Sequence, residues 1–120
     1  MKGILILAHG SREKTTENTL DEIISMLKAE LKECIIEIAF LQFSEVNLSK
    51  GLDKLVHKGV DDIKVIPYFL FDGVHIREDI PKEIEEYLKD KSHIKISIGK
   101  TLGADKRLAE ILVDRVKEVV

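Results

Sequence analysis

The sequence lacks several features on which whole classes of protein depend. Its 120 residues include one cysteine, Cys34, so no disulfide can form within the chain. No apolar run approaches the length of a bilayer span, and the apolar residues that follow Met1 are too few for the core of a secretory signal. We therefore expect neither a disulfide-stabilised scaffold nor a membrane protein, and we predict a location in the reducing cytoplasm.

The sequence also lacks an excess of charge of one sign, because the formal net charge is only −3 although 34% of the residues are charged. This balance argues against nucleic acid or an anionic membrane as the main partner. The sequence contains no Gly-x-x-x-x-Gly-Lys-Ser/Thr loop for nucleotide phosphates. Linkers, low-complexity segments and internal repeats are absent too, so we predict one domain over residues 1–120.

Apolar runs and amphipathic segments alternate along the chain. Strands are predicted over residues 3–8, 35–41, 63–70 and 94–98. Helices are predicted over 19–31, with an earlier start near Thr15 as the alternative, over 48–59, from Pro81 and from Asp105. Thr19 and Glu22 match a capping box. The last helix is expected to bury its apolar side chains, which are Leu108, Ile111, Leu112, Val116 and Val119.

The order βαβαβαβα predicts an α/β fold, an open parallel sheet of about four strands with helices on both faces. Right-handed crossovers leave few topologies, and we expect the flavodoxin-like strand order 2-1-3-4. The first and third strands are neighbours in that order. The topological switch point, where open α/β sheets bind ligands, then lies between their carboxyl ends.

Two histidines follow these two strands directly, His9 after the first and His75 after the third. Imidazole is a good ligand for divalent transition metals, and it also titrates near neutrality and can accept a proton. Two histidines leave coordination positions open, unlike a closed structural zinc site. The alternative is that both are ordinary polar loop residues. His57 and His93 lack this setting and are expected on the surface.

Two segments of the chain carry a resemblance to a known family. They are Leu-Ala-His-Gly-Ser-Arg at 7–12 and Ile-Pro-Tyr-Phe-Leu-Phe-Asp-Gly-Val-His-Ile-Arg-Glu-Asp-Ile-Pro at 66–81. Both resemble the signature segments of the small class II tetrapyrrole chelatases, the short CbiX-type sirohydrochlorin cobalt- or nickel-chelatases of archaea. Chain length, element order and the positions of both motifs agree with that family.

The resemblance implies ATP-independent insertion of divalent cobalt or nickel into sirohydrochlorin, in cobalamin or nickel-tetrapyrrole (coenzyme F430) biosynthesis. The metal is then a substrate, and no cofactor is permanently bound. His9 and His75 match the metal-binding histidines of the family, and His9 also matches its proton acceptor. The residues that match substrate-contacting positions are Glu45, Leu70, Phe71, Asp72, Gly73, Val74 and His75.

The chemistry of the substrate adds further expectations. Sirohydrochlorin carries many carboxylates, and Ser11, Arg12 and Arg77 flank the two histidine loops where such groups would need donors. Tyr68, Phe69 and Phe71 offer a flat apolar wall, although strand residues alternate faces and at least one of the three should lie in the core. A ligand this large would overhang a four-stranded domain. We therefore predict a homodimer.

Two other functions remain open from the sequence. A carrier of metal or tetrapyrrole that performs no turnover would use the same histidines. A histidine-dependent phosphoesterase is suggested by His9-Gly10 near an arginine, but Ala8 stands where such enzymes place an arginine of their own. Metal chelation into sirohydrochlorin is the function that the resemblance favours over these alternatives.

Overall fold

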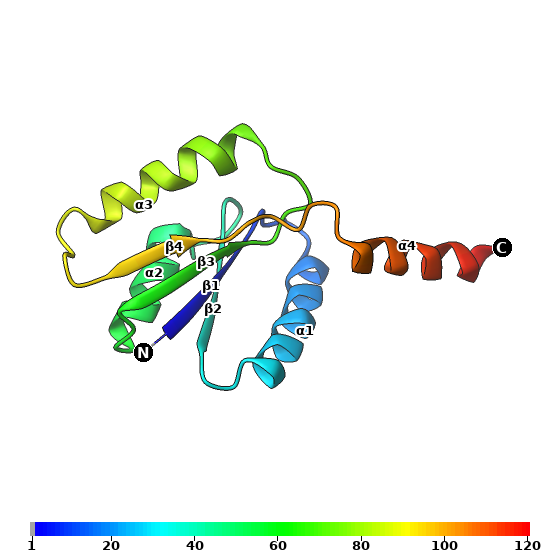
Figure 1. The fold of residues 1–120 in the computed structure, drawn as a ribbon, viewed down its shortest axis with the longest axis horizontal. Coiled ribbons are helices and arrows are strands. Elements are labelled where there is room, and N and C mark those ends of the chain that lie inside the picture. The colour runs from blue at the N-terminus through cyan, green and yellow to red at the C-terminus, as the bar shows by residue number, and fades with distance from the viewer. Residues whose placement is uncertain (1) are drawn as a thin grey trace.

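Strands and helices alternate from one end of the chain to the other (Figure 1). The computed structural model describes residues 2–120, with the backbone alone described at residues 75 and 76. The elements are β1 (Lys2–Ala8), α1 (Lys14–Glu30), β2 (Ile35–Phe40), α2 (Leu48–His57), β3 (Asp62–Pro67), the π-helical turn η1 (His75–Asp79), α3 (Ile80–Leu88), β4 (Lys95–Ile98) and α4 (Lys106–Val119). The predicted element order is confirmed.

The four strands form one parallel sheet in the order β2-β1-β3-β4, which confirms the predicted topology. β1 and β3 are neighbours, and their carboxyl ends stay in register because Leu7 pairs with Pro67. Proline cannot donate to a sheet, and Pro67 is the last residue of β3. The pairing continues beyond it, since the amide of Tyr68 donates to the carbonyl of Leu7 at 2.8 Å.

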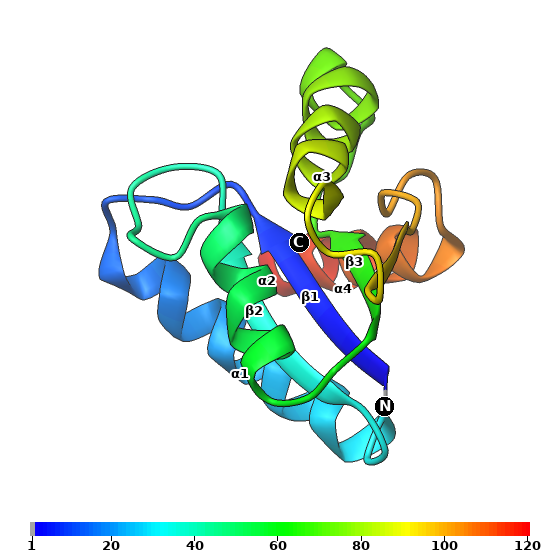
Figure 2. The same ribbon diagram turned by 90° about the vertical axis from the view of Figure 1, so that its left-hand side faces the viewer.

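The helices cover both faces of the sheet, with α1 on one face and α2 and α3 on the other (Figure 2). On the α2/α3 face the centre of the core is closed to solvent. Its side chains that are 0% exposed include Leu5, Leu7, Leu52, Leu55, Ile63 and Val65. On the α1 face a smaller cluster joins Ile6, Ala8, Leu20, Ile24 and Ile36. β1 therefore contributes apolar side chains to both layers.

The start of α1 differs from the prediction. The helix begins at Lys14, after Glu13, whose side chain makes no capping hydrogen bond. Thr19 lies inside the helix, where its hydroxyl donates to the carbonyl of Thr15 at 3.1 Å. The capping box at Thr19 and Glu22 is therefore wrong, and the alternative start near Thr15 is the better one.

The predicted burial of the last helix is also wrong. α4 begins where expected, capped by the Asp105 carboxylate, which accepts from the amide of Arg107. Yet among the described residues none of α4 is buried, and the helix extends away from the body (Figure 1). The physical reason lies in the segment that precedes α4. The amides of Leu102 and Gly103 donate to the carbonyls of Phe69 and Leu70, so this segment runs beside the residues that follow β3, and α4 begins beyond the sheet.

Across the part of the chain that the structure describes, no helix combines the length and the apolar character needed to cross a bilayer. The surface histidines are as expected, because His57 and His93 are both exposed. Of the three candidate aromatic residues, Phe69 is 4% exposed and belongs to the core, whereas Phe71 is 80% exposed. The expectation that at least one of them is a core residue is thus confirmed.

Candidate functional site

His9 stands directly after β1, at the carboxyl edge of the sheet. Its carbonyl accepts from the amide of Gln42 at 3.0 Å, which extends the β1–β2 pairing beyond the end of β2. Gly10 follows with φ of +89°, a left-handed conformation that favours glycine and turns the chain away. The position of the histidine is therefore set by the sheet and by this turn.

The imidazole of His9 packs against a core aromatic ring. The centroids of the His9 and Phe69 rings lie 4.1 Å apart, with the planes inclined at 50°. Phe69 is buried, whereas His9 is exposed. The ring is therefore supported on one side by a rigid core residue and remains accessible to a ligand on the other.

Three hollows meet at His9. The largest, about 590 Å³, is lined by His9, Leu41, Gln42, Asp79, Ile80, Lys82 and Glu83. The second, about 390 Å³, is lined by His9 and by residues 68–73. The third, about 340 Å³, lies toward the start of α1 and is lined by Ala8, His9, Gly10, Thr16, Thr19, Leu20, Phe40 and Tyr68.

The hollows differ in chemical character. The largest carries the charged side chains of Asp79, Lys82 and Glu83, while the second is walled mainly by aromatic and aliphatic groups. His9 borders both, so its imidazole can face a hydrated ion on one side and an apolar ring on the other. Such an arrangement suits a reaction that joins a metal to a flat organic ligand.

The sequence did not reveal the polar residues of the largest hollow. A signal was available for Gln42, which follows the second strand and so had to reach the same sheet edge as His9. For Asp79 and Glu83 the signal was their i,i+4 spacing at the start of a helix, which places two carboxylates on one face.

The segment over residues 68–73, hereafter the aromatic loop, exposes much of its apolar surface. Leu70 is 50% and Phe71 is 80% exposed. The loop is held by the segment after β4, since the Thr101 hydroxyl donates to the Asp72 carboxylate at 3.0 Å. Residues 70–73 thus border the hollow beside His9, and their contact with substrate stays a prediction.

The second predicted metal ligand, His75, is described by its backbone alone. That backbone opens η1, just after the aromatic loop, while its side chain lies outside the described residues. Among the described side chains, no group of three or more His, Cys, Asp or Glu is placed to hold a metal ion. The pairing of His9 with His75 therefore stays a prediction.

The predicted carboxylate-binding residues are exposed or partly exposed and lie outside the His9 hollows. The Arg12 guanidinium sits 4.8 Å from the centroid of the Phe43 ring, in a hollow of about 380 Å³ that Ser11 also lines. The Ser11 hydroxyl accepts from the amide of Glu13 at 3.0 Å. Arg77 is exposed, and its amide donates to the carbonyl of Gly73. None of the three lines a hollow that His9 borders, so their contact with substrate stays a prediction.

Glu45 lies apart from the His9 hollows. It occupies an exposed turn in which its carbonyl accepts from the amide of Asn47, and it lines none of the three hollows described above. Gln42, from the same loop, is the residue that reaches His9. A substrate contact by Glu45 stays a prediction and would require a ligand that extends over the rim.

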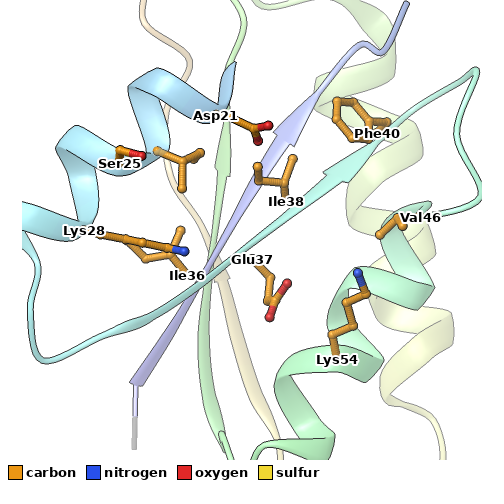
Figure 3. A pocket seen from close by; sticks show the side chains of 10 residues that line it. Asp21, Ser25, Lys28, Ile36, Glu37, Ile38, Phe40, Val46 and Lys54 are labelled. Carbon is orange, nitrogen blue, oxygen red and sulfur yellow. The ribbon is translucent and has the colours of Figure 1, made fainter. Parts of the chain in front are cut away.

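Another hollow, of about 410 Å³, lies along the outer edge of β2 and is not part of this site (Figure 3). Asp21, Ser25 and Lys28 reach it from α1, and Lys54 reaches it from α2 (Figure 3). Nearby, Lys58 forms an ion pair with Glu37 of β2. This hollow shares Phe40 with the third hollow at His9, but neither His9 nor the aromatic loop lines it.

Comparison with known proteins identifies similar chains. A sirohydrochlorin cobaltochelatase of Sulfurisphaera tokodaii is 34% identical over 120 residues, covering 100% of this chain and 95% of that protein. A sirohydrochlorin ferrochelatase of Priestia megaterium is 29% identical, covering 98% of this chain but only 44% of the relative. The cobalt complex of the sirohydrochlorin chelatase SirB from Bacillus subtilis subspecies spizizenii superposes with a TM-score of 0.90 at 30% identity, covering 98% of this chain and 50% of that structure.

The family itself follows from a match over nearly the whole chain. The model of the CbiX family matches residues 3–119, which include His9, the aromatic loop and α4. Together with the relative that shares 34% identity over 120 residues and is covered to 95%, this match assigns the family. The chain belongs to the CbiX family.

Proposed function

We propose that this protein inserts a divalent metal, cobalt or nickel, into sirohydrochlorin without ATP, and that it does so in the cytoplasm for cobalamin or nickel-tetrapyrrole (coenzyme F430) biosynthesis. The observation that carries the proposal is the position of His9. Its imidazole is supported by Phe69 and borders both a charged hollow and the aromatic loop. The cobaltochelatase and ferrochelatase names of its relatives support the same reaction class.

Metal insertion asks two things of a protein: water must leave the ion, and two protons must leave ring nitrogens. A neutral imidazole nitrogen can perform either task but not both at once, because a nitrogen that holds the metal has no free electron pair for a proton. We propose that His9 first holds the ion and afterwards accepts a proton. His75 serves as the second metal ligand in this proposal.

The macrocycle binds beside the aromatic loop in this proposal. Leu70 and Phe71 expose apolar surface next to His9, and flat aromatic ligands bury such surface favourably. Ser11, Arg12 and Arg77 contact the peripheral carboxylates, and Glu45 contacts the ring margin. Holding ring and ion together supplies proximity, which accounts for much of a barrier without nucleotide hydrolysis.

We also propose that the functional unit is a homodimer. The hollow beside the aromatic loop measures about 390 Å³, near the lower end of the range for sites that enclose small ligands. A tetrapyrrole with its carboxylate arms would extend beyond it. This chain covers 50% of the SirB chain. The rest of that relative is about as long as this chain, so a second copy of this chain would supply a similar length.

The proposal is tested by following the absorption of sirohydrochlorin at substoichiometric protein, with Co²⁺, Ni²⁺ and Fe²⁺ in parallel. Turnover above the control of metal and ring alone is expected without ATP, and the fastest ion identifies the preferred metal. Binding without acceleration would instead support a carrier. Hydrolysis of an aryl phosphate that disappears in His9→Ala would support a phosphoesterase.

A further inference from the structure

We propose that Phe43 is a positioning residue for substrate binding, whose ring holds the Arg12 guanidinium ready for a peripheral carboxylate of the tetrapyrrole. Because Arg12 contacts substrate only in the proposed function, this role of Phe43 rests on that function and deepens it. Three features of Phe43 support the role: the conformation of its backbone, the exposure of its ring and its contact with Arg12.

The backbone of Phe43 adopts a conformation that a bulky residue rarely takes. Its φ is +60°, and in the part of the chain that the structure describes no other residue except glycine has a positive φ. A side chain in this left-handed region crowds the backbone, so the conformation is strained. Glycine would remove the strain, as it does at Gly10 and Gly59. An aromatic residue held under strain indicates a use for its ring other than folding.

The loop that carries Phe43 is fixed at both ends, so the strained residue has a defined position. Just before Phe43, the amide of Gln42 donates to the carbonyl of His9 at 3.0 Å. The loop closes where the amide of Phe40 donates to the carbonyl of Val46 at 2.9 Å. The segments that follow β1 and β2 therefore run side by side (Figure 2). Phe43 comes directly after Gln42, which lines the largest hollow at His9.

The ring of Phe43 contributes little to the core. Phe43 is 51% exposed, and it belongs to neither of the two core clusters formed by the described residues. Its ring instead contacts a cation, since the guanidinium carbon of Arg12 lies over it at 4.8 Å from the centroid. An aromatic face attracts a guanidinium through its quadrupole. The ring therefore restricts where the Arg12 side chain can lie.

The contact with Phe43 leaves the donors of Arg12 available, because an aromatic ring offers no acceptor oxygen. The guanidinium groups of Arg107 and Arg115 each donate to a carboxylate of a nearby residue at 2.8 Å. Within the described residues, that of Arg12 makes no such hydrogen bond or ion pair. The guanidinium presents its N–H groups as a planar fork that matches a carboxylate. Arg12 is thus held in place and still free to bind an anionic ligand.

The hollow around this pair carries more positive than negative charge. It measures about 380 Å³ and is lined by Ser11, Arg12, Lys14, Glu17 and Phe43, so two cations accompany one carboxylate. The hollow joins the segments that follow β1 and β2, and both segments leave the sheet at His9 and its hydrogen-bonded neighbour Gln42. A carboxylate arm of a ring bound at His9 is therefore offered Arg12 in a fixed position.

The test is a double-mutant cycle on the binding of metal-free sirohydrochlorin, followed by its absorption as protein is added. Phe43→Leu should raise Kd about two- to fivefold, the equivalent of one cation–aromatic contact. Arg12→Leu should raise Kd at least about tenfold, because a charge-assisted hydrogen bond is lost. Since Phe43 acts through Arg12, the double variant should bind no more weakly than Arg12→Leu. Phe43→Tyr keeps the aromatic face and should bind like the wild type.

The matched control uses the other cation over an aromatic ring, Lys91, which lies 4.1 Å from the centroid of the Tyr87 ring. Lys91→Leu removes the same charge as Arg12→Leu and should leave Kd unchanged. Phe43→Gly removes both ring and strain, so it provides a folded variant even if Phe43→Leu unfolds, and it should bind as weakly as expected for Phe43→Leu. A wild-type Kd in the Leu or Gly variant overturns the inference. Weak binding by Phe43→Tyr overturns it too, and so does a double variant whose effect is the product of the single effects.

The Kd values are measured without metal, so the two proposals can fail separately. A wild type that binds sirohydrochlorin and shows the coupling, but inserts no metal, would retain the role of Phe43 in ring binding and reject the chelatase. A wild type that inserts metal while Phe43 and Arg12 act independently would do the reverse. A wild type that does not bind sirohydrochlorin overturns both.

Discussion

The two faces of the sheet differ in how completely they are covered. On the α2/α3 face, Leu52, Leu55 and Ile63 have no exposed surface, and this layer is closed. On the other face, α1 covers β1 and β2, while α4 points away and leaves its apolar stripe in solvent. The comparison teaches that the α2/α3 layer is the better packed of the two, whereas the hollows at His9 draw on both layers, with Lys82 and Glu83 of α3 on one side and Thr16 and Leu20 of α1 on the other.

His9 lies where the two faces meet. The two residues before it divide between the layers, since Leu7 belongs to the closed one and Ala8 to the open one. The histidine therefore gains a rigid support, Phe69, from the closed layer while its other surroundings remain open. A site with this construction can keep one group fixed while a large ligand enters.

Leu52→Ala should have the largest effect, because its side chain is 0% exposed in the closed layer. We expect a loss of about 2–5 kcal/mol in the free energy of unfolding, measured by urea denaturation. Leu27→Ala, a partly buried leucine of the α1 layer, is the matched control and should lose about half as much. Equal losses would mean that the two faces are equally well packed.

Gly10→Ala should rank second. Gly10 has φ of +89°, and an added Cβ would overlap the carbonyl oxygen of Gln42. Strain and overlap together should destabilise by about 3 kcal/mol. Gly59→Ala shares the positive φ but has open space around the added Cβ, so urea denaturation should give a loss of only about 1–2 kcal/mol. If Gly59→Ala is as harmful as Gly10→Ala, the close approach at His9 is not important.

Thr101→Val should have a smaller effect that is confined to the open side. The substitution removes the hydrogen bond from Thr101 to Asp72, worth about 1 kcal/mol, and loosens the aromatic loop. In the insertion assay we expect the KM for sirohydrochlorin to rise about fivefold with little change in kcat. Ser97→Ala, which removes a hydroxyl that accepts from the Lys64 ammonium between β3 and β4, should leave KM unchanged. An unchanged KM in Thr101→Val would mean that the Thr101–Asp72 hydrogen bond does not contribute to the binding of sirohydrochlorin.

The smallest effect concerns Tyr87 on the closed side. Burial, and then its hydrogen bond to Asp53, raise the pKa of the Tyr87 phenol above its ordinary value. The folded chain thus keeps this proton over a range where the unfolded chain loses it. Stability should fall as the pH rises above about 10. Urea denaturation at about pH 8 and pH 11 should show a shallower fall in Tyr87→Phe; an identical fall would assign the loss to other groups.

Much of the fold could be predicted from the sequence because its strands are uninterrupted apolar runs. With the strand order inferred from right-handed crossovers, the position of His9 at the carboxyl edge followed directly. The ends of elements were less accurate: β3 ends at Pro67, three residues before the predicted end at 70, and α2 ends at His57, two residues before Gly59. Local chemistry therefore determined which edge carries the site, but not the exact ends of the elements.

The remaining features depend on contacts between distant segments. Gln42 reaches the largest hollow from the loop after β2, and Asp79 and Glu83 reach it from the start of α3; the spacing of the two carboxylates could place them on one helix face but could not show that this face meets Gln42. Periodicity identified the apolar side of α4 but could not say what covers it. The Thr19 and Glu22 pair imitated a helix start because α1 begins in a polar stretch without a side-chain cap. The pairing of His9 with His75 stays a prediction because the side chain of His75 lies outside the described residues.

The most direct test of the central claim is the initial rate of cobalt insertion by His9→Ala at substoichiometric protein. Loss of a metal ligand and proton acceptor should reduce the rate by at least about 100-fold, with unchanged circular dichroism because His9 is exposed. His93→Ala, another exposed histidine, should keep the wild-type rate. A wild-type rate in His9→Ala at subsaturating metal would contradict the account.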